Sequence, residues 1–125
     1  MNTLILLAET ERSWSPVVWA VERGAESTED GRTILDERDG WLSIRPDQSL
    51  LDDFGDDEKA DALGGIADPS LFVVEWRGDW LIETFVDAVP PECRAFVDND
   101  HGVFVPVTLL QNVPRAAWAR VAALQ

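Results

Sequence analysis

The apolar positions in the first third of the chain predict a strand, a helix and a second strand. Residues 3–8 form a short leucine-rich run, which is typical of a buried strand, although so few apolar residues also fit a helix. Ser15 and Pro16 precede an apolar run that ends shortly before Gly24. This order matches an N-cap, a first-turn proline and a C-terminal glycine, so we expect a helix there despite its β-branched valines. Residues 41–44 predict the second strand.

The polar segments between these runs predict turns and short helices. Residues 22–40 are polar and contain several glycines, which indicates a loop or a weak exposed hairpin around Asp30 and Gly31. Asp47 suits the N-cap of a helix with Leu50, Leu51 and Phe54 on one side, and a second helical stretch is expected between Asp56 and Gly64.

Strand-forming residues dominate the chain after Pro69. Residues 71–76 and 80–86 are rich in Val, Ile, Phe and Trp, and the three residues between them suit a turn, so we expect a hairpin. After two prolines, residues 93–97 and 103–107 predict a second hairpin.

The last residues predict a helix that packs on the sheet. Its apolar positions recur at helical spacing: Ala117, Trp118, Val121 and Leu124. With 125 residues, of which 46% are hydrophobic, residues 1–125 suffice for a single globular domain. The fold class we expect is α+β, a mostly antiparallel sheet of about five to six strands with helices packed on one face, including the C-terminal helix.

Charge narrows the range of binding partners. The chain has 24 acidic and 10 basic side chains, a formal net charge of -14, and 16 of the acids lie in residues 1–64. Such a field repels nucleic acid and anionic membranes and attracts a basic protein. The lone cysteine and the short apolar start, without a preceding Lys or Arg, lead us to expect a cytoplasmic protein without a signal peptide or a membrane span.

Catalytic and metal-binding patterns are weak. Cys93 and His101 are the single thiol and the single imidazole, and the expected hairpin separates them by roughly 13 Å. A calcium loop counted from Asp98 fails because Gly102 stands one position early and Leu109 occupies the place of the bidentate Glu. We therefore expect no cofactor, no metal and no catalytic residue.

One carboxylate pair keeps a hydrolase open as an alternative. In the expected hairpin, Glu75 and Glu83 share one face of the sheet about 7–8 Å apart, a spacing that suits acid–base hydrolysis of glycosides. Shifting the turn by one residue separates them. Asp98 and Asp100 are a second pair that such an enzyme could use.

The densest acidic segment is the candidate binding site. An aromatic side chain surrounded by carboxylates suits a basic cleft, whereas the plain alternative is a solvated face that serves solubility. The net charge exceeds the magnitude of about 2–8 that solubility requires, which favours binding. The candidate partner-binding residues are Asp52, Asp53, Phe54, Asp56, Asp57, Glu58 and Asp61.

In size and charge the chain resembles the immunity proteins and antitoxins that block basic nuclease toxins. That resemblance implies a non-catalytic, stoichiometric inhibitor whose carboxylates take the place of phosphates against the toxin's Lys and Arg side chains. The first alternative is an acidic adaptor or secretion chaperone that acts as a homodimer through an apolar sheet face. The second is the small hydrolase. Whether the protein is a monomer or a homodimer stays open.

Overall fold

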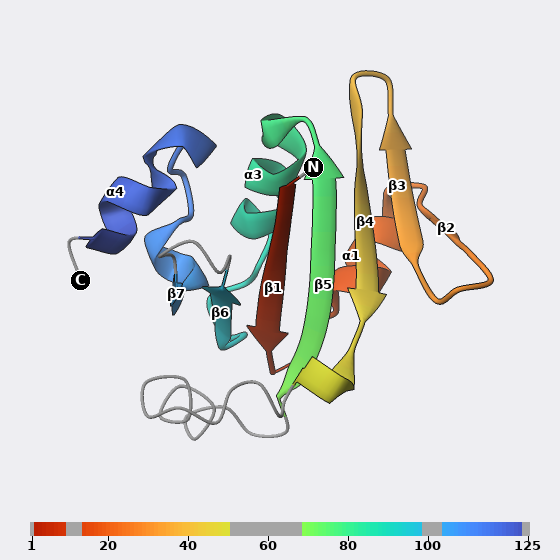
Figure 1. The fold of residues 1–125 in the computed structure, drawn as a ribbon, viewed down its shortest axis with the longest axis horizontal. Helices are drawn as coiled ribbons and strands as arrows, with labels where there is room; N and C mark the ends of the chain where they lie inside the picture. The colour runs from red at the N-terminus through yellow and green to blue at the C-terminus, as the bar shows by residue number, and fades with distance from the viewer. Residues whose placement is uncertain (1, 10–13, 51–68, 99–103, 124–125) are drawn as a thin grey trace.

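One antiparallel sheet organises the computed structural model, which describes residues 2–9, 14–50, 69–98 and 104–123. Within these residues the sheet has seven strands in the order β2-β3-β4-β5-β1-β6-β7 (Figure 1). The strands are β1 (Asn2–Ala8), β2 (Glu26–Ser27), β3 (Thr33–Glu37), β4 (Gly40–Pro46), β5 (Ser70–Arg77), β6 (Ala95–Asp98) and β7 (Phe104–Pro106).

Two helices cover one face of this sheet, behind the strands in Figure 1. Helix α1 (Pro16–Glu22) packs near β3, and α3 (Asp79–Asp87) packs on β4 and β5. Helix α4 (Trp118–Ala123) follows two short 3-10 turns, η2 (Val107–Leu109) and η3 (Arg115–Ala117). The described residues therefore form an α+β domain with seven strands, rather than the five to six expected, and with the C-terminal helix that the sequence predicts.

The leucine-rich first strand lies inside the sheet, which explains its apolar composition. β1 pairs with β5 on one side and with β6 on the other. Leu4 and Leu6 face the helices in the main core, while Leu7 faces the opposite side and packs with Leu71. A strand that is buried on both faces has no solvated positions, so its sequence is apolar without alternation. The predicted strand over residues 3–8 is confirmed.

The segment that we expected to be the second strand of a hairpin is a helix, so the prediction for residues 80–86 is wrong. Leu81, Ile82, Phe85 and Val86 are buried, and this spacing is the stripe of an α-helix. Gly78, at a φ of 96°, turns the chain out of β5 into the helix. β5 pairs with β4 and β1 instead. A short apolar run rich in Ile, Phe and Val satisfies both periods, and tertiary packing decides between them.

Other predicted elements are confirmed with adjusted bounds. α1 has the expected Ser15 N-cap, and the hairpin around Asp30 and Gly31 is formed by β2 and β3. The second hairpin is β6–β7, in which Val97 pairs with Val105. After Asp47 the chain forms a single 3-10 turn, and the rest of the two helices expected between residues 47 and 64 lies outside the described residues.

The C-terminal segment packs through Trp118. This side chain is 1% exposed, and its Nε1 donates a hydrogen bond to the carbonyl oxygen of Val113 at 3.1 Å. The guanidinium carbon of Arg115 lies 5.0 Å from the centroid of the Trp118 ring and 5.7 Å from that of Trp76. The predicted contact between the C-terminal helix and the core is confirmed for Trp118. Leu124 lies outside the described residues.

Gly40 is the position where two strands approach too closely for a side chain. A Cβ at Gly40 would lie 2.1 Å from the backbone oxygen of Arg77. We expect Gly40→Ala to lower the free energy of unfolding by about 2–3 kcal/mol, because the backbones must separate. Urea denaturation measures this loss. The control, Gly31→Ala, meets no atom within 4 Å and carries only the strain of a φ of 86°, about 1 kcal/mol. Equal losses in the two variants would contradict the close approach.

Candidate functional site

The acidic segment that the sequence indicates as the binding site is not part of the described structure. Asp52, Asp53, Phe54, Asp56, Asp57, Glu58 and Asp61 all lie outside the described residues, as do Asp100 and His101.

The structure separates the two glutamates of the hydrolase alternative. Glu75 lies on β5 opposite Thr3 and Ser43, on the sheet face that points away from the helices. Glu83 lies on α3, where its Oε2 accepts a hydrogen bond from the backbone N–H of Arg115 at 2.6 Å. The expected placement of both carboxylates on one sheet face is therefore wrong, because residue 83 belongs to a helix that packs on the other face.

Cys93 is a buried, protonated thiol. Its Sγ donates a hydrogen bond to the backbone oxygen of Glu9 at 3.3 Å. Burial raises the pKa of this thiol, and the carboxylates of Glu9 and Glu92 raise it further. Because the thiolate is the nucleophile, such an environment does not suit covalent catalysis.

The reactivity of Cys93 tests this environment. At pH 8 we expect the folded protein to react with a maleimide at least about tenfold more slowly than the protein unfolded in urea. The raised pKa also means that the folded state keeps its proton after the unfolded state has lost it, so this group's contribution to stability declines at alkaline pH. Equal rates in folded and unfolded protein would contradict the burial of the thiol.

The described part of the chain holds neither a cluster of metal-ligating side chains nor a helix that could cross a membrane. Across residues 2–9, 14–50, 69–98 and 104–123, no three His, Cys, Asp or Glu side chains gather where they could hold a metal ion. None of the helices in these ranges combines the length and the apolar character that crossing a membrane requires.

Acidic side chains gather instead at the β2 end of the sheet. Residues 22–39 hold seven acidic and three basic side chains, and the β2–β3 and β3–β4 hairpins carry most of the acids. We call six of these side chains the acidic edge: Glu26, Glu29, Asp30, Asp36, Glu37 and Asp39. Sequence reasoning assigned this stretch to an exposed hairpin and missed its concentration of charge on one end of a sheet.

Local hydrogen bonds fix the turn between β2 and β3. The backbone N–H of Thr28 donates to the oxygen of Arg32 at 2.8 Å, and Gly31 adopts the positive φ that this turn needs. The Thr28 hydroxyl and the Arg32 Nε donate to the carboxylate of Asp30. These bonds lower the pKa of Asp30, the Thr28 hydroxyl most strongly. These bonds define the turn of the β2–β3 hairpin, which carries Glu26, Glu29 and Asp30 of the acidic edge.

Most of the acidic edge lacks a neutralising partner. Asp30 forms an ion pair with Arg32 at 2.9 Å. The other five carboxylates have no Lys, Arg or His nitrogen of the described residues within 4.0 Å. Their negative charge is uncompensated by direct contacts, so this end of the sheet presents a negative surface to an approaching molecule.

Two hollows give the acidic edge its shape. One, of about 350 Å³, lies among the β3–β4 turn, Trp41 and Arg77. The other, of about 430 Å³, lies along β2 beside Ile34. Asp36 borders both hollows, and it pairs across the strands with Trp41, while Glu26 pairs with Ile34. Two half-buried apolar side chains are thus flanked by carboxylates, the combination that the sequence suggested around Phe54.

Compared with family models, with curated proteins and with solved structures, the chain matches none. Charge and geometry are therefore the observations that bear on its function.

Proposed function

We propose that this protein binds a basic protein through its acidic edge and blocks it stoichiometrically, in the manner of immunity proteins and antitoxins. One observation carries the proposal: four carboxylates without an ion-pair partner among the described residues, Glu26, Asp36, Glu37 and Asp39, line two hollows beside Trp41 and Ile34. The net charge of -14 supports it, since the whole molecule attracts a cationic partner.

Inhibition by such a surface needs no turnover. Long-range attraction speeds the encounter, and carboxylates at the edge then face the Lys and Arg side chains that a nuclease-like partner uses for phosphates. Trp41 and Ile34 supply apolar area at the centre of the contact, where desolvation lengthens the lifetime of the complex. Charge thus sets the rate of association, and the apolar centre sets the rate of dissociation.

The form of the edge strand favours recognition by side chains. β2 has only two residues, and both are exposed. A short edge strand with charged neighbours is a poor template for adding another strand. The partner is therefore expected to dock on the side chains of the two hairpins and not to extend the sheet.

The adaptor alternative receives less support from the described residues. Leu7 and Leu71, at the centre of the sheet face that points away from the helices, are 0% exposed. Within residues 2–9, 14–50, 69–98 and 104–123, the large apolar side chains that are well exposed lie on helices instead: Val18, Val21 and Trp80. The hydrolase alternative needs Glu75 and Glu83 on one sheet face, and the structure separates them. Its other carboxylate pair, Asp98 and Asp100, stays a prediction.

Differential capture tests the proposal. The tagged protein and the variant E26Q/D36N/E37Q/D39N are immobilised side by side, exposed to native lysate at low salt and eluted with a salt gradient. We expect a basic protein that the parent retains in a 1:1 complex, that the variant loses, and whose activity the parent inhibits. Capture of no basic protein, or equal capture by both forms, contradicts the proposal.

A further inference from the structure

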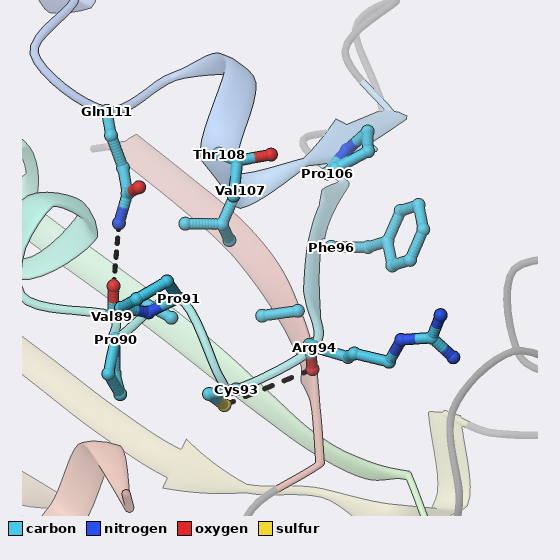
Figure 2. A pocket seen from close by; sticks show the side chains of 11 residues that line it. Val89, Pro90, Pro91, Cys93, Arg94, Phe96, Pro106, Val107, Thr108 and Gln111 are labelled. Carbon is cyan, nitrogen blue, oxygen red and sulfur yellow. Dashed lines mark hydrogen bonds between the residues drawn. The ribbon is translucent and has the colours of Figure 1, made fainter.

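A recess lies at the β7 end of the sheet, opposite the acidic edge. A ligand bound there would be independent of the proposed function. The recess encloses about 280 Å³ between residues 89–96, which lead from α3 into β6, and residues 106–111, which follow β7 (Figure 2). Apolar side chains and the thiol of Cys93 make most of its lining: Val89, Pro90, Pro91, Cys93, Ala95, Pro106 and Val107.

The walls of this recess are buried side chains and prolines. Val89, Ala95 and Val107 are at most 6% exposed and belong to the main core. Pro90 and Pro91 fix the backbone angle φ on one side of the opening, and Pro106 does so on the other. A preformed apolar cavity binds a ligand without the cost of ordering its walls.

Gln111 and Thr108 are the neutral polar side chains in the lining, and Figure 2 shows the Thr108 hydroxyl turned away from Gln111 and Cys93. The Nε2 of Gln111 donates hydrogen bonds to the carbonyl oxygens of Val86 at 3.1 Å and of Val89 at 2.7 Å. Both N–H bonds of the amide are thereby used on carbonyls at the C-terminal end of α3. The side-chain Oε1 then points toward Val107, as Figure 2 shows, and it accepts no hydrogen bond from the described residues.

The backbone around Gln111 is also held in place. The N–H of Asn112, a residue with a φ of 62°, donates to Asp87 Oδ1 at 2.8 Å. The N–H of Leu110 donates to the oxygen of Val107 at 2.9 Å. The Oε1 acceptor is therefore fixed by both side-chain and backbone contacts, which is the preorganisation that a binding group needs.

No charged side chain reaches the interior of the recess. The Cys93 thiol is neutral, with its proton directed to Glu9. Arg94 borders the recess, but Figure 2 shows its guanidinium turned away from Cys93 and Gln111. An occupant is therefore neutral and largely apolar, and it carries one hydrogen-bond donor for Gln111.

Size narrows the occupant further. An apolar cavity of about 150 Å³ accommodates benzene, so a recess of about 280 Å³ has room for a fused pair of rings. We propose that the recess binds a neutral bicyclic heteroaromatic ring, an indole, whose N–H donates to Gln111 Oε1. The ring comes from a free small molecule or from a tryptophan side chain of a peptide.

Titration followed by amide chemical shifts tests this assignment on the whole protein. Indole is expected to cause saturable shifts confined to residues 89–96 and 106–111. 1-Methylindole, which fills the same space without an N–H donor, is expected to bind about tenfold more weakly, because it leaves the Gln111 acceptor unpaired. N-acetyltryptophanamide separates the two sources: binding as tight as that of indole indicates a peptide side chain, and much weaker binding indicates a free small molecule.

A matched variant ties the selectivity to Gln111. In Gln111→Met, indole is expected to bind as weakly as 1-methylindole, whose own affinity changes little. Absence of saturable shifts with indole, shifts located elsewhere, or equal affinities of indole and 1-methylindole for the parent protein would overturn the proposal. The comparison of indole with 1-methylindole uses the parent protein alone, so it tests the proposed hydrogen bond even if the variant fails to fold.

Discussion

Replacing four carboxylates of the acidic edge by amides, in the variant E26Q/D36N/E37Q/D39N, is expected to slow association with the basic partner by about tenfold or more at low ionic strength. These side chains line the two hollows and have no ion-pair partner among the described residues. Electrostatic steering accelerates association by factors of about 10 to 1,000, and the effect shrinks as salt screens it over about 10 Å at 0.1 M. The difference between parent and variant should therefore narrow as salt is added.

A charge-matched variant separates steering from contact. The variant D52N/D53N/D56N/D57N removes the same number of charges from the segment that the sequence indicated. Stopped-flow mixing and a dissociation assay then give both rates. We expect both variants to associate slowly at low salt, but only the edge variant to dissociate faster, because only its carboxylates contact the partner. Faster dissociation of the second variant alone would place recognition at Asp52–Asp57 instead, and an unchanged association rate of the edge variant would remove the acidic edge from recognition.

Trp118→Ala is expected to lower the free energy of unfolding by about 3–5 kcal/mol. The ring is 1% exposed within the main core, and its Nε1 is hydrogen-bonded to Val113. Truncation leaves a cavity and also removes the ring on which the Arg115 guanidinium stacks. A loss of this size is a large part of the stability of a small domain.

The control for this prediction is a tryptophan at the surface. Trp80, in the first turn of α3, is 45% exposed. Trp80→Ala should cost about 1 kcal/mol or less, since little packed area is lost. Chemical denaturation of the two variants measures the difference, and similar losses would show that the C-terminal helix does not pack as described.

The elements that the sequence predicted correctly are those whose conformation is determined by residues close together in the sequence. Ser15, Pro16 and Gly24 mark the ends of α1 because caps and prolines impose backbone conformations directly. β1 has a continuous apolar run between polar residues. The hairpin around Asp30 and Gly31 forms because its turn residues hydrogen-bond within five positions.

The errors arise where distant contacts decide. Residues 80–86 satisfy the period of a strand and that of a helix, and β5 takes β1 and β4 as neighbours, so a helix is left to cover the core. The acidic edge needs two hairpins to bring its carboxylates together. Likewise, Gln111 reaches the carbonyls of Val86 and Val89 only after the chain has turned through β6 and β7. No local sequence pattern predicts these contacts between distant residues.

The position of β1 inside the sheet sets the order in which the molecule can assemble. This strand needs β5, which begins at Ser70, and β6, which begins at Ala95, to satisfy its two edges. On a ribosome, its leucines emerge before β5 and β6 and stay without these partners until both strands have been made. Contacts so distant in sequence close slowly, so the sheet is expected to form only after β6 has been made, in one late cooperative step, with the leucine-rich β1 exposed until then.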